Sequence, residues 1–176
     1  TFQSLAASSE SGYARALGFA PPELRQKLYS EAFLKLRGDY RAEQPLEQLM
    51  RDAPARSGLD RAQYADLKVW LPGDILTKVD RTSMSVGLEA REPLLDYRLI
   101  EFAATLPEKL RISGGQGKWL MKRAMRRYLP EDILYRPKQG FVTPIAQWFQ
   151  GPLAGEARAI GQGSALARTG WFDARA

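Results

Sequence analysis

The segment Leu76-Thr-Lys-Val-Asp-Arg-Thr-Ser-Met-Ser-Val-Gly-Leu-Glu-Ala-Arg-Glu-Pro-Leu-Leu-Asp96 interleaves charged and apolar residues. An ion near the boundary of a hydrophobic core is costly to desolvate unless it is paired or serves a ligand. Surface helices usually place their charges on one face, and this segment does not separate them in that way. We therefore expect part of a functional site here. Its charged residues before Asp96 are Lys78, Asp80, Arg81, Glu89, Arg91 and Glu92.

The spacing of these charges restricts how they can pair on a helix. Asp74 and Lys78 are four residues apart and can form an ion pair. Lys78 and Asp80 are two apart, so they point about 200° away from each other. We expect one of the two aspartates to face a cleft and the other to be bonded within the domain. Glu89 and Arg91 are either a buried pair bonded to the backbone or part of the cleft lining.

The composition is that of a globular chain and restricts the chemistry. The 176 residues are 44% hydrophobic and 26% charged, with no cysteine and no histidine. Acid–base catalysis would therefore fall to Asp, Glu, Lys or Tyr. The absence of cysteine fits a reducing compartment, and we expect a cytoplasmic protein. No apolar run approaches the roughly 20 residues that span a bilayer, so no membrane partner is expected.

The net charge of +6 and the pI of about 9.7 predict attraction to anions. Lys and Arg are spread along the chain, which disfavours nucleic acid as a partner. The densest cluster lies on an amphipathic helical pattern, and it is a solvated helix face, a contact for a nucleotide phosphate, or a nucleic-acid contact. Its members are Lys118, Lys122, Arg123, Arg126 and Arg127.

Helical patterns dominate, and the fold class expected is mainly α. We find no alternation of strands and helices, and only Lys109–Ile112 is a candidate strand. Asp60 and Asp96 are expected to cap the helices that follow them. The expected helices run from Pro21-Pro22 to Gly38, within 39–58, from Asp60 to Pro72-Gly73, from Asp74, after Asp96, from Gly117 to about Leu129, over 131–134, from Thr143-Pro144 through Trp148, from Pro152 and from Trp171.

Several blocks, in the same order, resemble the synthetase domain of glutamine-hydrolysing asparagine synthetases and their amidotransferase relatives. Matches to several blocks in order are far more specific than a match to one motif. The clear resemblance covers about residues 64–148. The blocks are Thr77–Met84, Gly87–Asp96, Gly117–Ala124, Leu129–Phe141 and Pro144–Trp148.

The resemblance implies a single helical domain over residues 1–176. It would be the C-terminal portion of an ATP pyrophosphatase domain, which is similar to adenine nucleotide α hydrolases, with the nucleotide-binding sheet largely absent. The glutaminase domain and the Ser-Gly-Gly-x-Asp-Ser phosphate loop of the family are expected outside this chain. The segment Ser113-Gly-Gly-Gln-Gly-Lys118 lacks the Asp and fails the Walker spacing, so we interpret it as a turn and helix cap.

The family chemistry implied has two steps. ATP, with Mg²⁺, activates a carboxylate as an acyl-adenylate and releases pyrophosphate, and ammonia from glutamine then attacks the acyl group. Aspartate is the leading candidate for the carboxylate, with asparagine as product, although relatives act on other carboxylates. We expect the fragment alone to be inactive, and no set of metal ligands is evident in it.

The resemblance also assigns candidate site residues. Lys138, in the loop between Pro137 and Gly140, is implied to contact the acyl-adenylate and to stabilise charge in the second step. Asp74 or Asp80 is implied to help bind the substrate or deprotonate the amine. The candidate binding residues for substrate or intermediate are Lys78, Arg81, Glu89, Arg91, Arg136 and Gly140.

Two other classes of function remain open. The chain could be a stand-alone helical module for protein interaction, or a basic nucleic-acid-binding domain with a steep salt dependence of affinity. For the enzyme, the partners expected are the small-molecule substrates and the upstream half of the parent chain, with a homodimer as one option. Trp148 and Phe149 are expected at a surface that a missing partner covers.

Overall fold

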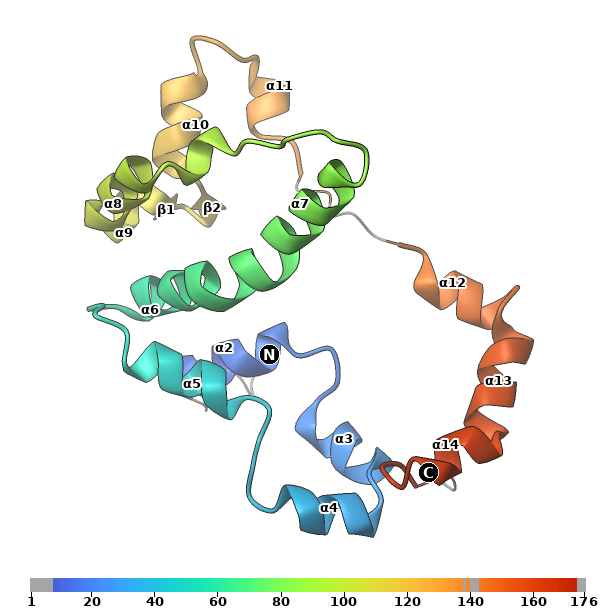
Figure 1. Ribbon diagram of the computed structural model, residues 1–176. Helices are drawn as coiled ribbons and strands as arrows, with labels where there is room; N and C mark the ends of the chain where they lie inside the picture. Colours follow the sequence, from blue (N-terminus) through green and yellow to red (C-terminus); the bar gives the residue numbers. More distant parts are fainter. Residues whose placement is uncertain (1–7, 138, 140–142, 174–176) are drawn as a thin grey trace. The chain divides into compact units, whose positions relative to one another are not determined.

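The computed structural model describes residues 8–137, 139 and 143–173, and they are mainly helical (Figure 1), as predicted. Among these residues the only strands are two of two residues each. The chain divides into two compact units: residues 1–48 with 140–176, and residues 49–139. The single domain over residues 1–176 stays a prediction.

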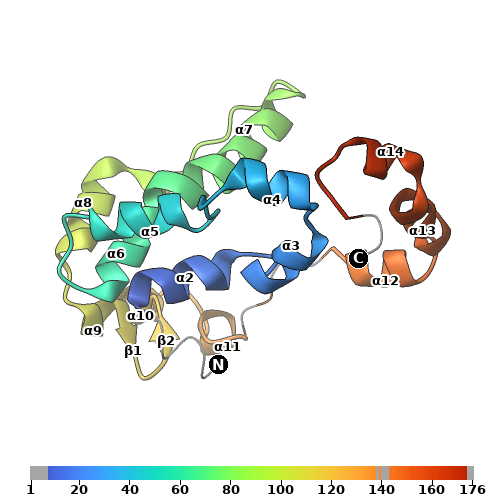
Figure 2. The ribbon, with the colours of Figure 1, turned by 90° about the horizontal axis from the view of Figure 1, so that it is seen from below.

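The first unit contains helices from both ends of the chain. The predicted helix from Pro21-Pro22 to Gly38 is in fact two helices, because Ser30 begins a new one by accepting a hydrogen bond from the backbone N–H of Phe33. Helices α12 to α14 follow one another in a compact group (Figure 2). The helices are α2 (Ser9–Leu17), α3 (Pro22–Leu28), α4 (Glu31–Arg37), most of α5 (Gln44–Arg51), α12 (Ile145–Gln150), α13 (Ala154–Gln162) and α14 (Ser164–Arg168).

The last described residues pair with the junction between α3 and α4. Tyr29 forms an antiparallel bridge with Phe172, and the Ser30 N–H donates to the Trp171 carbonyl at 2.9 Å. The ring of Phe33 lies 4.8 Å from that of Tyr29 and 6.1 Å from that of Trp171. The prediction that a helix begins at Trp171 is wrong for the described residues, because this segment pairs with Tyr29 in extended form.

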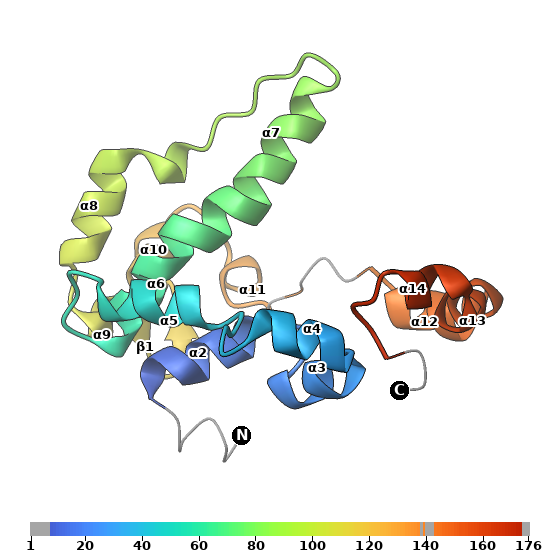
Figure 3. The ribbon, with the colours of Figure 1, turned by 60° about the horizontal axis from the view of Figure 1, so that its bottom comes forward.

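A continuous helical rod is the main feature of the second unit (Figure 3). It consists of α6 (Gly58–Ala65), the π-helical segment η1 (Asp66–Leu76) and α7 (Thr77–Met84). The prediction that Pro72-Gly73 ends the helix is wrong. A proline in an α-helix removes a donor and clashes with a carbonyl of the preceding turn. The wider π-helical turns accommodate Pro72 here, and the Thr77 hydroxyl donates to its carbonyl at 2.6 Å.

The N-cap of α6 also differs from the prediction. Ser57, not Asp60, is the cap, and its hydroxyl accepts from the Asp60 N–H at 3.1 Å. The Asp60 carboxylate instead pairs with Arg111, which also donates to Gln63. Asp96 caps α8 as predicted, by accepting from the Arg98 N–H at 2.9 Å.

The remainder of the second unit is a set of short elements. The run Lys109–Ile112 is mostly helix rather than strand, because the strand begins only at Ile112. The helix after Gly117 ends at Met125, earlier than the predicted Leu129. The elements are η2 (Pro93–Leu95), α8 (Tyr97–Thr105), α9 (Glu108–Arg111), β1 (Ile112–Ser113), β2 (Gln116–Gly117), α10 (Trp119–Met125) and α11 (Glu131–Leu134).

The segment over residues 113–118 is a turn and a helix cap, as predicted. Ser113 pairs with Gln116 across an antiparallel hairpin. Gly114 and Gly115 form its turn with φ of 56° and 76°, as a two-residue hairpin turn with two positive φ angles requires. Lys118 is also left-handed, with φ of 59°, at the N-cap of α10.

Few apolar side chains are fully buried in the described residues. The buried apolar set is Ala14, Met50, Ala53 and Ala65. Along η1 and α7, Leu76 and Val79 are half-buried, whereas Ile75 and Met84 are exposed. Within the described residues, the helices therefore present apolar faces that remain exposed.

Candidate functional site

The candidate residues of the long helix are mostly exposed. Asp74 and Lys78 form the expected i, i+4 ion pair, with Nζ 3.6 Å from Oδ1. Asp80 and Arg81 are exposed and form no ion pair with any residue that the structure describes. Lys78 is thus held toward Asp74, while the Asp80 carboxylate is left available to a ligand.

Glu89 and Arg91 pair with each other at 2.9 Å, on the segment that connects α7 to η2. The expectation of a buried pair is wrong in this chain, because 69% of the Glu89 side chain and 79% of the Arg91 side chain are exposed. Residues 88–92 form no helix or strand, and no element covers them. The pair is therefore free to line a cleft completed by other protein.

The loop between α11 and α12 contains the remaining candidates. Lys138 and Gly140 lie outside the described residues. Arg136 is exposed and has no ion pair within the part of the chain that the structure describes. A cation near Lys138 is therefore not neutralised by a neighbouring carboxylate.

The basic cluster of α10 packs on aromatic rings. Lys122 and Arg126 both lie over Tyr135, at 5.6 and 5.5 Å from the ring centroid. Arg126 also donates to the Tyr135 hydroxyl at 3.0 Å, and this hydrogen bond raises the pKa of the guanidinium. Arg123 lies over Trp119 at 5.3 Å. These contacts hold the cations against the protein surface.

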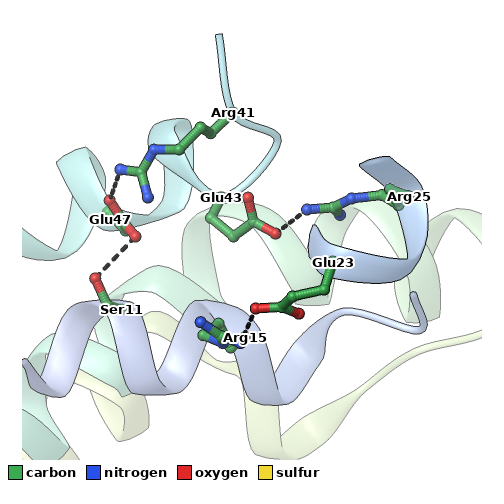
Figure 4. A network of polar contacts seen from close by, with 7 residues as sticks. All are labelled: Ser11, Arg15, Glu23, Arg25, Arg41, Glu43 and Glu47. Atoms are coloured by element: carbon green, nitrogen blue, oxygen red, sulfur yellow. Dashed lines mark hydrogen bonds and ion pairs between the residues drawn. The ribbon is translucent and has the colours of Figure 1, made fainter. Parts of the chain in front are cut away.

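Sequence reasoning missed a polar network in the first unit (Figure 4). Residues 39–58 showed only a helix between loops, yet Glu43 and Glu47 are 8% and 2% exposed. Glu43 directly precedes α5 and Glu47 lies one turn into it, so their spacing of four, which places both on one side, was the available signal. The network is Arg15–Glu23 at 2.7 Å, Arg25–Glu43, Arg41–Glu47 at 2.8 Å and Ser11–Glu47 at 2.9 Å.

Arginine partners lower the pKa of two carboxylates, Glu43 and Asp60. Burial by itself raises the pKa of Glu43, but hydrogen bonds from Arg25 and from its backbone, with the charges of Arg25 and Arg41, hold that pKa below its ordinary value. The hydrogen bond from Arg111 is the main cause that lowers the pKa of Asp60, against a smaller opposing effect of burial. Both groups are ionised structural partners at neutral pH.

Comparison with known proteins defines the class. The family model described as asparagine synthase matches residues 2–176. The chain therefore belongs to the asparagine synthase family.

Curated relatives agree with this assignment. The chain is 35% identical to asparagine synthetase [glutamine-hydrolyzing] 1 of Bacillus subtilis over 99 residues, which are 56% of this chain and 16% of that protein. It is 40% identical to a putative asparagine synthetase [glutamine-hydrolyzing] of Mycobacterium bovis over 90 residues, 51% of this chain and 14% of that protein. It is 40% identical to the asparagine synthetase [glutamine-hydrolyzing] of Gallus gallus over 83 residues, which are 43% of this chain and 15% of that protein.

These matches cover about a sixth of the length of the relatives. No solved structure matches the chain significantly. None of the helices in the described ranges is both long and apolar enough to cross a membrane.

Proposed function

We propose that this chain is the C-terminal helical part of the synthetase domain of an ATP-dependent amidotransferase, with the fold of the adenine nucleotide α hydrolases. The observation that supports this most is the family match over residues 2–176. The relatives are named as glutamine-hydrolysing asparagine synthetases. Aspartate is accordingly the carboxylate that we propose as substrate.

The proposed reaction needs cations near a developing negative charge. The carboxylate oxygen attacks the α-phosphate of ATP and pyrophosphate leaves. Ammonia then attacks the acyl carbon, AMP leaves and a proton is released. A cation in a site that excludes water stabilises the charge of both steps efficiently. Lys138 is the residue that we propose for this role, with Arg136 beside it and Gly140 shaping the loop.

The charged groups of residues 74–91 are proposed to serve the same cleft. Asp80 is exposed without an ion pair among the described residues, whereas Asp74 is paired with Lys78. Asp80 is thus the better placed of the two aspartates to accept a proton from the attacking amine. Arg81, Lys78 and the pair Glu89–Arg91 are proposed to contact substrate or intermediate.

ATP and its Mg²⁺ would be held mainly by parts of the protein outside this chain. Within the described residues, no three Asp or Glu side chains gather in one place. Mg²⁺ that accompanies ATP is usually held by phosphate oxygens, water and one or two carboxylates, so most of its ligands would come with the nucleotide. The upstream phosphate loop is the element that we propose for the nucleotide.

The test uses the longer protein that contains this chain, assayed with ATP, aspartate and ammonia. Lys138→Ala is expected to lower kcat for amide formation by about 10²–10³-fold, since it removes one charge-stabilising group. Lys138→Arg should retain part of the rate. Lys109→Ala, an exposed lysine of α9, is the matched control and should stay within about twofold.

Aspartate-dependent exchange of pyrophosphate into ATP separates the two steps of the reaction. If Lys138 acts mainly in the second step, its replacement by alanine reduces amide formation more than exchange. The proposal fails if the wild-type protein shows no exchange with aspartate or any other carboxylate. Equal rates for Lys138→Ala and Lys109→Ala would remove Lys138 from the mechanism but leave the reaction in place.

A further inference from the structure

The first unit contains a cavity that the proposed reaction does not use. Its volume is about 530 Å³, and its walls come from α2, α3, α4, the turn before α5 and the start of α5, all within residues 8–47. Cavities that bind small molecules measure roughly 300–1,000 Å³. None of the residues proposed for acyl transfer lies in this range, so the inference stands apart from the proposed function.

Four arginines line the cavity, and three of them are already neutralised. Each of the three forms an ion pair with a glutamate, as Figure 4 shows. These pairs hold the walls together and leave little charge for a ligand. They are Arg15 with Glu23, Arg25 with Glu43, and Arg41 with Glu47.

The fourth arginine, Arg37, is different. It lies at the end of α4 and lines the cavity. Its Nε is buried without a hydrogen-bond partner, and its guanidinium pairs with no carboxylate of the described residues. A guanidinium has five N–H donors in a planar fork. Such a group binds carboxylates and phosphates through two parallel hydrogen bonds.

An apolar wall lies beside this cation. Phe33 precedes Arg37 by four residues on α4, so both side chains lie on the same face of the helix. The ring of Phe33 contacts that of Tyr29 at 4.8 Å between centroids, and both rings line the cavity. A ligand here would meet an unpaired cation and an aromatic surface together.

We propose that this cavity binds a small organic anion. Its carboxylate or phosphate group pairs with Arg37, and its apolar part lies against Phe33 and Tyr29. With Arg15, Arg25 and Arg41 each paired to a glutamate, the charge of Arg37 is the one left over in the lining. The cavity therefore carries excess positive charge and favours an anion over a neutral or cationic compound.

Isothermal titration of the longer protein with benzoate, phenyl phosphate and benzamide tests the proposal. Benzamide has the shape of benzoate without its charge, and the two anions show which acidic group is preferred. At least one anion is expected to bind tenfold or more tightly than benzamide. Arg37→Gln should lower the affinity for that anion at least tenfold, and Arg37→Lys should keep part of the affinity.

Lys35→Gln is the matched control, because Lys35 is an exposed cation of the same helix outside the cavity lining. It should leave anion binding unchanged. Equal binding of anions and benzamide, or equal losses in Lys35→Gln and Arg37→Gln, would overturn the proposal. The proposal is also overturned if no anion binds. A lower midpoint of thermal unfolding in Arg37→Gln would then assign Arg37 a structural role instead.

Discussion

The Glu43 carboxylate illustrates how a buried charge is tolerated in a small helical unit. Only 8% of its side chain is exposed, and Arg25, itself 21% exposed, donates to it. An ion taken out of water loses hydration energy, which the pair recovers only while both partners are present and charged. The stability of this contact should therefore depend on pH and on each partner.

The pKa of Glu43 is lower in the folded chain than in the unfolded one, which fixes the sign of its pH dependence. The ionised Glu43 carboxylate contributes fully to the free energy of unfolding above its pKa in the unfolded chain. This contribution is lost as the pH falls through its lower pKa in the folded chain. We expect Glu43→Gln to lower the free energy of unfolding by about 2 kcal/mol at pH 7 and to change it little at pH 3. Amide hydrogen exchange in α3 and α5 at both pH values measures this.

Glu156→Gln, at an exposed glutamate of α13 in the same unit, is the control and should alter exchange at neither pH. The same loss for Glu43→Gln at pH 7 and pH 3 would show that the carboxylate charge is not what stabilises the contact.

A second residue-scale prediction concerns Asp60 and Arg111, which join α6 to α9. The Arg111 side chain is 12% exposed, so loss of its partner leaves a largely buried cation. Asp60→Asn is expected to lower the free energy of unfolding by about 1–3 kcal/mol. Urea unfolding compares it with Asp132→Asn, an exposed aspartate of α11 that should change stability by less than about 0.5 kcal/mol.

At the scale of elements, the rod from α6 to α7 shows why proline is an uncertain signal for a helix end. The missing N–H of Pro72 disrupts α-helical bonding, but π-helical turns shift the bonding pattern around it. The hydroxyl of Thr77 then bonds the Pro72 carbonyl. Asp74, Lys78 and Asp80 consequently share one continuous helix rather than lying after a break.

The turn of the hairpin between α9 and α10 allows a test of backbone strain. Gly115 has φ of 76°, a conformation in which an L side chain is strained. Gly115→Ala should cost about 1–2 kcal/mol in the free energy of unfolding. Gly155→Ala in α13 meets open space and no positive φ, so it should be neutral or stabilise by up to ~1 kcal/mol. Similar effects of the two substitutions would exclude strain as the cause.

At the scale of the whole molecule, the main feature is the large number of exposed apolar side chains. Val86 is 79% exposed, Leu36 is 81% exposed and Phe19 is 98% exposed. Trp148 and Phe149 are 44% and 49% exposed, in line with the surface expected for them. Exposed apolar faces of this extent are covered in proteins by further chain or by partners.

We therefore expect residues 1–176, produced alone, to associate with one another and to bind hydrophobic dyes. Sedimentation velocity over a concentration series measures the association. A longer protein whose other segments cover these faces, as proposed, should show neither behaviour at the same concentrations. A monodisperse monomer of residues 1–176 that binds no dye would contradict this expectation.

The amino-acid sequence by itself determined the helical class, the family, the cap at Asp96, the turn over residues 113–118 and the pairing of Asp74 with Lys78. These features depend on local spacing and on ordered motifs, which contain the information within a few residues. Only the tertiary structure revealed the break at Ser30, the passage of the helix through Pro72, the partner of Asp60 and the lack of a partner for Arg37 among the described residues. The partner of Asp60 lies about fifty residues further along the chain, which no local pattern records. The break at Ser30 and the passage through Pro72 depend on which of several local bonding patterns the backbone adopts, and Ser30 is held further by its bond to the distant Trp171.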